Sequence, residues 1–213
     1  LRQFELFIKK YYSDFNIILK RYGSVQIRNV ATMAGNIATA SPIGDSLPVL
    51  LSLNASITIE GFNKKTVIPL KDFFIGYRKT KLKKGQFIRS IRIPVFKKNI
   101  FKAYKISKRI DDDISSVCAS FNLAIANKKI KSIKIAYGGM AATPKRAIYC
   151  EKMLLNSNFS EDIILKAQKS LEKDFQPIDD MRASKDYRLE IAKNLLTKCF
   201  AEIKKNKLIR LSY

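Results

Sequence analysis

Apolar residues at helical spacing open the chain and indicate two short helices. Residues 1–12 bring several apolar side chains near one face, namely Leu1, Phe4, Leu6, Phe7 and Ile8. Residues 14–22 form the second helical candidate. The next stretch, VATMAGNIATASPIGD over residues 30–45, is poor in charge and rich in small residues, which predicts a loop. Beyond it, Ser46 is placed to cap a helix through SLPVLLSLN, where Pro48 is tolerated in the first turn.

Alternating apolar and polar residues then predict β-strands. ASITIEG alternates Ile57 and Ile59 with polar residues, and KKTVIPL follows after a short turn, so the two runs form a β-hairpin. QFIRSIRIPV shows the same alternation and ends as a strand at Pro94.

The pattern changes from about residue 101. Three strand-like runs, FKAYKISK, SVCASFNLAIA and KIKSIKIAYGG, follow one another, with a turn at residues 127–129 between the last two. Ser160 precedes two acidic residues at the start of SEDIILKAQKSLEKDF, which marks a helix N-terminus. A long terminal helix carries a buried stripe formed by Leu189, Ala192, Leu196, Cys199 and Ile203.

Strands followed by helices, rather than strict alternation, predict an α+β fold. The lysine-rich segment VFKKNIF is the best candidate for a boundary between domains, at about residues 97–99. The sequence therefore predicts two domains, 1–96 and 97–213.

The charge of the chain is strongly basic, with a formal net charge of +23. Phosphate binding is a common reason for such a balance, so a basic nucleic-acid-binding module is one alternative. However, the lysines are spread along almost every segment and outnumber the arginines, which are the preferred residues for planar phosphate and base contacts. This distribution favours a general compositional bias, and it makes the run RKTKLKK at residues 78–84 a solvated loop.

Composition also bears on where the protein works. With 46% hydrophobic residues the chain can form a genuine core, and no apolar run of ~18 residues or signal peptide is evident. The sequence therefore predicts a cytoplasmic protein without a membrane span. Because the chain begins at Leu1 rather than Met, we expect that a larger polypeptide has been cut or partly retained.

Side-chain inventory limits the chemistry. The chain has no histidine, which excludes a Ser-His-Asp triad and an HExxH metal site within it. Its three cysteines, Cys118, Cys150 and Cys199, lack metal-ligand spacing and are expected to be buried as small hydrophobes. We therefore assign no metal ligand and no catalytic side chain, and expect any chemistry to come from a cofactor, carboxylates or lysines.

The segment TMAGNI, residues 32–37, is a candidate for close approach to a ligand. Small side chains expose the backbone, Gly35 can adopt φ > 0, and consecutive N–H groups can bind phosphate oxygens. Asn36 adds amide donors, and Asp45 can accept a hydrogen bond from a ribose or ribityl hydroxyl. The alternative is an ordinary tight connection between two elements.

Five motifs in order carry a resemblance that covers nearly the whole chain. They are QIRNVATMAGNIATASPIGDSLPVLLSLNA, FFIGYRKT, YKISKRIDDDIS, AYGGMAATPKRA and MRASKDYRLEIAKNLL. In this order they resemble the FAD-binding subunits of bacterial xanthine dehydrogenases, within the molybdenum hydroxylase family. The resemblance implies that residues 1–96 form the second lobe of a two-lobed FAD-binding domain. It implies that residues 97–213 form a domain similar to the C-terminal domain of carbon monoxide dehydrogenase flavoproteins, an antiparallel sheet packed with helices.

The resemblance also implies the residues that contact FAD. It assigns Tyr22 as an aromatic platform and Asp45 as a carboxylate acceptor. It assigns Ile88 as an apolar contact and Lys105 as a cation. The backbone cradle consists of Thr32, Met33, Ala34, Gly35 and Asn36. Without the resemblance, Tyr22 and Ile88 would be interpreted as core residues and Lys105 as a solvated strand residue. Ala34 departs from the family pattern, in which a second glycine is frequent. If that position requires φ > 0, alanine would cost about 1 kcal/mol.

The acidic run at residues 111–113 is placed by the resemblance beside the flavin ring, where clustered carboxylates would disfavour negative charge on the reduced ring. The alternative is a turn with solvated aspartates. The family's other glycine-rich phosphate loop and its iron–sulfur domain lie upstream of the matching region, so this chain is expected to supply half of a flavin site.

The implied function is that of the flavin component of a xanthine dehydrogenase-like enzyme in purine catabolism. Electrons would pass from iron–sulfur clusters through FAD to NAD+, with [2Fe–2S] clusters and molybdopterin held by an upstream region or by a large partner subunit. Besides the nucleic-acid module, a non-catalytic remnant that docks with the molybdenum subunit is an open alternative.

Overall fold

The first half of the chain is mainly helical and leads into a small antiparallel sheet. A computed structural model describes residues 1–206. Its first elements are the helices α1 (Arg2–Ile8), α2 (Ser13–Lys20), α3 (Val25–Val30), α4 (Met33–Thr39) and α5 (Ser46–Ser52). The strands β1 (Ser56–Gly61) and β2 (Lys64–Pro69) form the predicted hairpin, and β5 (Phe87–Arg92) pairs with the other edge of β1. Between β2 and β5 lie the short elements η1 (Leu70–Asp72), β3 (Phe74–Gly76) and β4 (Lys79–Thr80).

The second half begins with a four-stranded antiparallel sheet. Its order is β6 (Ile100–Ile106), β7 (Val117–Ala126), β8 (Lys129–Gly138) and β9 (Lys145–Arg146). The turn between β7 and β8 places Asn127 and Lys128 at positive φ, as a tight hairpin turn requires. Three helices follow, α6 (Ile148–Leu154), α7 (Glu161–Asp174) and α8 (Lys185–Lys205). This arrangement confirms the predicted α+β fold.

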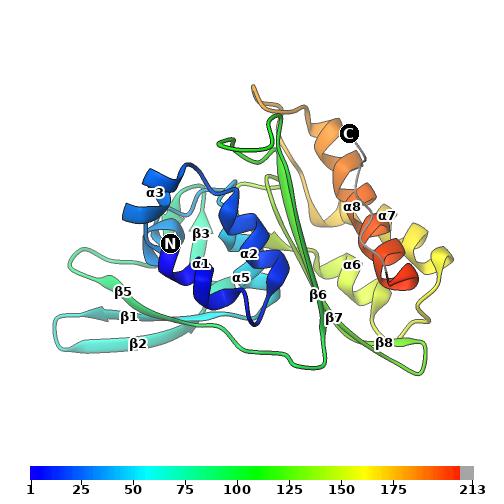
Figure 1. Cartoon of the computed structure of the whole chain (residues 1–213), viewed down its shortest axis with the longest axis horizontal. Coiled ribbons are helices and arrows are strands. Elements are labelled where there is room, and N and C mark those ends of the chain that lie inside the picture. Colours follow the sequence, from blue (N-terminus) through cyan, green and yellow to red (C-terminus); the bar gives the residue numbers. More distant parts are fainter. Residues whose placement is uncertain (207–213) are drawn as a thin grey trace.

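The larger sheet lies between two hydrophobic cores (Figure 1). In β7 the side chain of Cys118 packs in the first core with α1, α2, α4 and α5, whereas its neighbours Val117 and Ala119 pack in the second core with α6 to α8. Because both faces of β7 are covered, most of this strand is buried. The first core draws residues from both predicted domains, since Ala103 and Ala136 pack in it. The predicted boundary at 97–99 stays a prediction, and the predicted domain 97–213 extends beyond the described residues.

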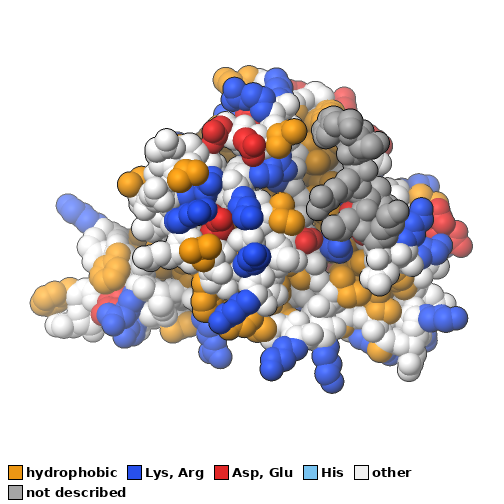
Figure 2. Space-filling view, in the orientation of Figure 1, with side chains coloured by type: hydrophobic (Ala, Val, Ile, Leu, Met, Phe, Trp, Pro, Cys, Tyr) orange, Lys and Arg blue, Asp and Glu red, His pale blue; other side chains and the backbone are white. Residues whose placement is uncertain are grey.

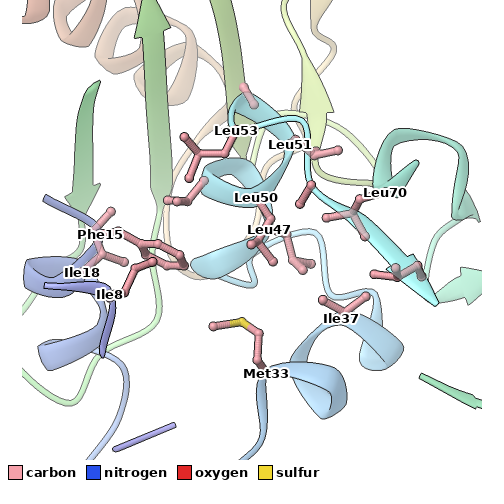
Figure 3. Packing of buried hydrophobic residues seen from close by; sticks show 14 of the residues in the cluster. Ile8, Phe15, Ile18, Met33, Ile37, Leu47, Leu50, Leu51, Leu53 and Leu70 are labelled. Carbon is pink, nitrogen blue, oxygen red and sulfur yellow. The ribbon is translucent and has the colours of Figure 1, made fainter. Parts of the chain in front are cut away.

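Leucines of α5 and of its C-cap position form the centre of the first core. Leu47, Leu50 and Leu53 are fully buried, and Figure 3 shows Met33 and Ile37 of α4 facing them. Phe15 of α2 reaches the same cluster from the other side. This packing holds α4 against α5 and thereby fixes the position of the α4 surface that faces away from the core.

The segment 30–45 is not the loop that its composition predicts, because α4 lies within it. The side-chain oxygen of Thr32 accepts a hydrogen bond from the Gly35 amide at 2.9 Å, which caps the helix. Met33 and Ile37, one turn apart, supply its apolar face. The helix is so short that helical spacing is visible in the sequence only as this one pair of larger apolar residues among small ones.

Two finer predictions also differ from the structure. Leu6 and Phe7 are 66% and 56% exposed, because α1 buries the turn-spaced side chains of Phe4 and Ile8 instead. Asp45, not Ser46, occupies the N-cap position of α5, and its carboxylate makes no capping hydrogen bond. The stripe predicted for the terminal helix is confirmed, with Ala192, Leu196 and Cys199 buried and Leu189 and Ile203 packed against them.

Gly139 joins the two halves where the chain leaves β8. Its φ is +82°, and a Cβ atom there would collide with the Ser116 carbonyl oxygen. The Gly139 amide donates a hydrogen bond of 2.8 Å to the Pro42 carbonyl, which anchors the turn that precedes α5. Within residues 1–206 no helix is long and apolar enough to cross a membrane.

Candidate functional site

A cleft of about 570 Å³ opens where the helical first half meets β6 and the loop after it. Several of the residues predicted to contact a cofactor line this cleft together, namely Tyr22, Thr32, Gly35, Asn36, Asp45 and Lys105. Small residues shape much of the remaining wall, including Gly23, Ala31 and Gly44. The tertiary structure therefore collects side chains from segments that are far apart in the sequence.

The N-terminal turn of α4 forms one wall. Thr32 holds this turn through the cap to Gly35, and its carbonyl accepts from the Asn36 amide at 3.1 Å. The Gly35 and Asn36 amides are therefore engaged within the turn, whose residues Thr32, Gly35 and Asn36 line the cleft. Gly35 has a helical conformation, so the capacity of glycine for φ > 0 is not used there. Ala34 also lies outside the positive-φ residues, so alanine carries no conformational cost at that position.

Tyr22 and Asn36 are linked by a chain of hydrogen bonds. The Asn36 side-chain amide donates to the Tyr22 hydroxyl at 2.7 Å, and its oxygen accepts from the Ser46 hydroxyl. Burial and the nearby negative charge of Asp45 raise the pKa of Tyr22, so the phenol stays neutral. Because both ends of the Asn36 amide are engaged, its orientation in the cleft is fixed.

Asp45 and Lys105 form a buried ion pair. The Lys105 ammonium lies 2.6 Å from Asp45 Oδ2, and the Ser115 hydroxyl donates to Oδ1 at 2.5 Å. Lys105 also donates to the Arg21 carbonyl at 2.9 Å. Burial raises the pKa of the Asp45 carboxyl, while the Lys105 ammonium opposes this shift. Lys105 is therefore not a solvated strand residue, and both oxygens of Asp45 already accept hydrogen bonds from the protein.

The loop between β6 and β7 covers one side of the cleft and is held by Arg21. The guanidinium of Arg21 donates to the carbonyls of Ile110 at 2.8 Å and Lys105 at 3.0 Å. Asp113 accepts from the Arg109 amide at 2.8 Å and from the Ile114 amide at 2.9 Å. These amide hydrogen bonds lower the pKa of Asp113, and the one from Arg109 has the larger effect.

The predicted acidic run therefore has divided roles. Asp112 and Asp113 line the cleft, while Asp111 is exposed and not among the lining residues. Asp113 acts mainly on its own loop, because its carboxylate closes the turn from Arg109 to Ile114. Placement of this run beside a flavin ring stays a prediction.

Three predicted contacts lie away from the cleft. The side chains of Met33 and Ile88 are 8% exposed and belong to the first core, and Ala34 packs against that core. Figure 3 shows Met33 directed toward α5. Ile88 therefore has the core position that its strand pattern alone indicates, and the part of Met33 or Ala34 that could face a ligand is the backbone.

Sequence reasoning missed several residues that line the cleft. Arg78 is the most distinctive, because it is exposed, has a φ of +52° and makes no ion pair with any described residue. It lies within FFIGYRKT, one of the motifs that carry the resemblance, and this was the available signal. Thr39 and Ser41 contribute hydroxyls, and Ile27 and Ile43 contribute apolar surface. In the sequence, only the long run of small residues indicated that these four residues could line a ligand site.

Two family models match consecutive parts of the chain. Residues 1–96 match the FAD binding domain in molybdopterin dehydrogenase. Residues 102–203 match the CO dehydrogenase flavoprotein C-terminal domain.

Curated relatives are similar over most of the chain. A xanthine dehydrogenase of Emericella nidulans is 39% identical over 161 residues, which are 74% of this chain and 12% of the relative. The glyceraldehyde dehydrogenase medium chain of Sulfolobus acidocaldarius is 34% identical over 185 residues, covering 85% of this chain and 64% of the relative. The chain thus spans a small part of the xanthine dehydrogenase and about two thirds of the medium chain.

Solved structures share the fold. Carbon monoxide dehydrogenase from Hydrogenophaga pseudoflava matches with a TM-score of 0.84 and 23% identity, over 89% of this chain and 66% of the matched chain. Quinoline 2-oxidoreductase from Pseudomonas putida 86 matches with a TM-score of 0.83 and 20% identity, over 95% of this chain and 70% of the matched chain. At this identity the likeness establishes the fold.

Proposed function

Since the chain belongs to the family of FAD-binding components of molybdenum hydroxylases, we propose that the cleft between α4 and β6 is one wall of its FAD site. The observation that carries this proposal is the convergence of Tyr22, Thr32, Gly35, Asn36 and Lys105 on one cleft. Tyr22, the start of α4 and Lys105 come from three separate parts of the chain, so the fold and not a local sequence pattern brings them together.

The groups in the cleft suit a dinucleotide with a diphosphate. The Ser41 hydroxyl and the exposed cation of Arg78 are donors appropriate for phosphate oxygens. Ile27 and Ile43 offer apolar surface of the kind that a planar ring system requires. The residues present therefore fit FAD.

When bound, FAD supplies hydride and electron transfer chemistry, which the protein itself does not perform. The side chains of this chain bind, orient and shield. Thr32 fixes the first turn of α4, and the hydrogen bonds of Asn36 keep the Tyr22 hydroxyl in place. We assign Asp45 and Lys105 a positioning role, because their ion pair ties β6 to the turn before α5.

The wider reaction follows from the family as a proposal. In it, the chain receives electrons from iron–sulfur clusters and passes them through FAD to NAD+, in company with a molybdopterin-binding large subunit. Support comes from relatives described as xanthine dehydrogenases, nicotinate hydroxylase and glyceraldehyde dehydrogenase medium chain. Oxidation of a purine is the substrate chemistry that the xanthine dehydrogenase relatives favour. All three cysteines are free, which agrees with the predicted cytoplasmic location.

The test of the FAD site is a titration of the chain with FAD, in which quenching of the flavin fluorescence measures binding. The substitutions Arg78→Ala and Tyr22→Ala should each weaken binding by about tenfold, since each removes a charge-assisted or stacking contact. Tyr22→Phe separates the two roles of that residue, because it keeps the ring and removes the hydroxyl that accepts from Asn36.

The matched control is Arg89→Ala. Arg89 is an exposed arginine of β5 that pairs with Glu60 at 2.7 Å and does not line the cleft. Its loss should leave the affinity for FAD unchanged. Equal affinities of the cleft and control variants for FAD would contradict the proposal.

The other functions considered from the sequence stay predictions. Figure 2 shows the Lys and Arg side chains spread over the visible face, with hydrophobic and neutral side chains between them. A spread of this kind gives less support to nucleic-acid binding than a continuous basic stripe would. Docking with a molybdenum subunit is compatible with the FAD proposal, since a flavin component also needs that partner.

A further inference from the structure

A second groove lies on the β1–β2 hairpin, at the end of the molecule remote from α6, α7 and α8 (Figure 1). Its volume is about 820 Å³. The floor is one face of the hairpin, where Ile59 is paired with Thr66 and Gly61 with Lys64. The segment from Ile75 to Gln86 supplies the opposite wall.

Four lysines surround the groove, and the residues that line it include no acid. Lys64, Lys81, Lys83 and Lys84 are all exposed, and none makes an ion pair within the described part of the chain. Glu60, the acidic residue of β1, is already paired with Arg89. Like charges held close together repel one another, and an acidic partner would relieve this repulsion.

Apolar side chains lie among these lysines. Phe62 at the hairpin tip is 95% exposed and Ile75 is 60% exposed, while Ile59 and Leu82 form deeper surface. This floor continues the core face of the sheet, since Ile57 on the same side is fully buried. The sheet thus has an apolar face that the described chain covers at one end and leaves open at the other.

The lysine-bearing wall is preformed. The Lys83 amide donates to the Gln86 side chain at 2.9 Å, and the Gln86 amide donates back to the Lys83 carbonyl at 3.0 Å. Gly61 allows this loop to approach the hairpin, because a Cβ atom there would lie 2.9 Å from Gln86 Cγ. A wall held in this way loses little conformational freedom when a ligand binds.

We propose that this groove docks an acidic segment of a partner protein that carries an apolar anchor residue. The lysines would pair with carboxylates of the segment, and the anchor would rest on the exposed side chains of Phe62 and Ile75. The uncompensated charge argues for acidic chemistry, and the apolar floor favours a polypeptide over a purely polar polyanion. This proposal does not depend on the FAD site, since the two clefts share no lining residue.

The experiment is a selection of random peptides displayed on phage against the full chain, followed by fluorescence anisotropy with the enriched peptides. The expected peptides combine Asp or Glu with a leucine or an aromatic residue. The charge-reversed variant Lys81→Glu/Lys84→Glu should bind them at least about tenfold more weakly, and added salt should weaken binding to the wild type. Phe62→Ser should also reduce the affinity, by removing the apolar contact.

The matched control is Lys166→Glu/Lys173→Glu, which makes the same charge change at exposed positions of α7. It should bind the enriched peptides as the wild type does. The proposal is overturned if the peptides lack acidic residues, or if the two double variants bind them equally. Binding of duplex DNA that competes with the peptides and is lost in Lys81→Glu/Lys84→Glu would also overturn it, in favour of a nucleic-acid partner.

Discussion

The side chains of Asp45 and Lys105 are 6% and 2% exposed, and they meet although the two residues are far apart in the sequence. Each of them has further partners, Ser115 for the carboxylate and the Arg21 carbonyl for the ammonium. A buried pair of this kind contributes little net stability compared with apolar residues, but losing one partner leaves an uncompensated charge. The pair is therefore best understood as a device that holds the base of the cleft in one arrangement.

Removal of one member of this pair should be costly. Lys105→Met should lower the free energy of unfolding by about 3–5 kcal/mol, because a buried carboxylate loses its counter-charge. The double variant Asp45→Asn/Lys105→Met should be more stable than Lys105→Met alone. Urea unfolding of the single and double variants measures this coupling, and strictly additive losses would show that the two side chains do not act as a pair.

The loss in Lys105→Met should also depend on pH. Burial already raises the pKa of Asp45, and without Lys105 the pKa rises further. Folded protein then holds the proton more tightly than unfolded chain, so protonation favours folding. The deficit relative to the wild type should be largest near neutral pH and shrink as the pH falls from about 7 to about 4. A deficit that grows toward low pH would contradict this assignment.

At the scale of elements, the helix starts differ in how they are capped. Thr32 and Ser184 accept hydrogen bonds from the amide of the third residue of α4 and of α8, Gly35 and Tyr187. Ser160 stands at the predicted N-cap of α7, yet its hydroxyl makes no capping hydrogen bond. The sequence pattern therefore locates a helix start without establishing whether the cap is formed, because the hydroxyl rotamer depends on neighbouring groups.

This difference predicts unequal effects of two similar substitutions. Ser184→Ala should reduce the free energy of unfolding by about 1 kcal/mol, because it removes a formed cap from α8. Ser160→Ala should change it by less than about 0.5 kcal/mol. Thermal and urea unfolding of both variants provides the comparison, and equal losses would mean that Ser160 caps α7 in solution.

For the whole molecule, the shared sheet should make the two cores one cooperative unit. Strands β6 to β8 pack in both clusters, and α5 of the first half lies against β7 and β8. Neither core can lose its packing without exposing one face of this sheet. Domain matches along the sequence therefore do not imply independent folding of the two halves.

The three buried cysteines can report on this cooperativity. Cys118 lies in the first core and Cys150 and Cys199 in the second, and burial raises the pKa of each thiol, so none reacts readily in the folded chain. Variants that retain a single cysteine should be labelled by a thiol reagent at the same rate in the transition region of urea. Labelling of Cys118 well before Cys199 would show that the first half opens separately.

Patterns along the chain predicted most of the secondary structure. Alternation at Ile57 and Ile59 identified the hairpin, and the three runs after residue 101 became β6, β7 and β8. The helix α4 was missed because its small residues have little periodic signal. Its apolar face consists of Met33 and Ile37 with two alanines, Ala34 and Ala38. Leu6 and Phe7 do not share the predicted face with Ile8, the buried apolar residue of α1, because only residues three or four positions apart lie on the same side of a helix.

For the candidate site, the sequence by itself determined which residue types recur in the family's order, and these included Tyr22, Asn36 and Asp45. Only the tertiary structure decided which of them face the cleft. In the folded chain the side chains of Met33 and Ile88 point into the core, since burying an apolar side chain is favourable wherever packing allows it. The tertiary structure paired Asp45 with Lys105, since a charge removed from water needs a partner. The sequence predicts the strand that carries Lys105 but does not indicate this pairing across 60 residues.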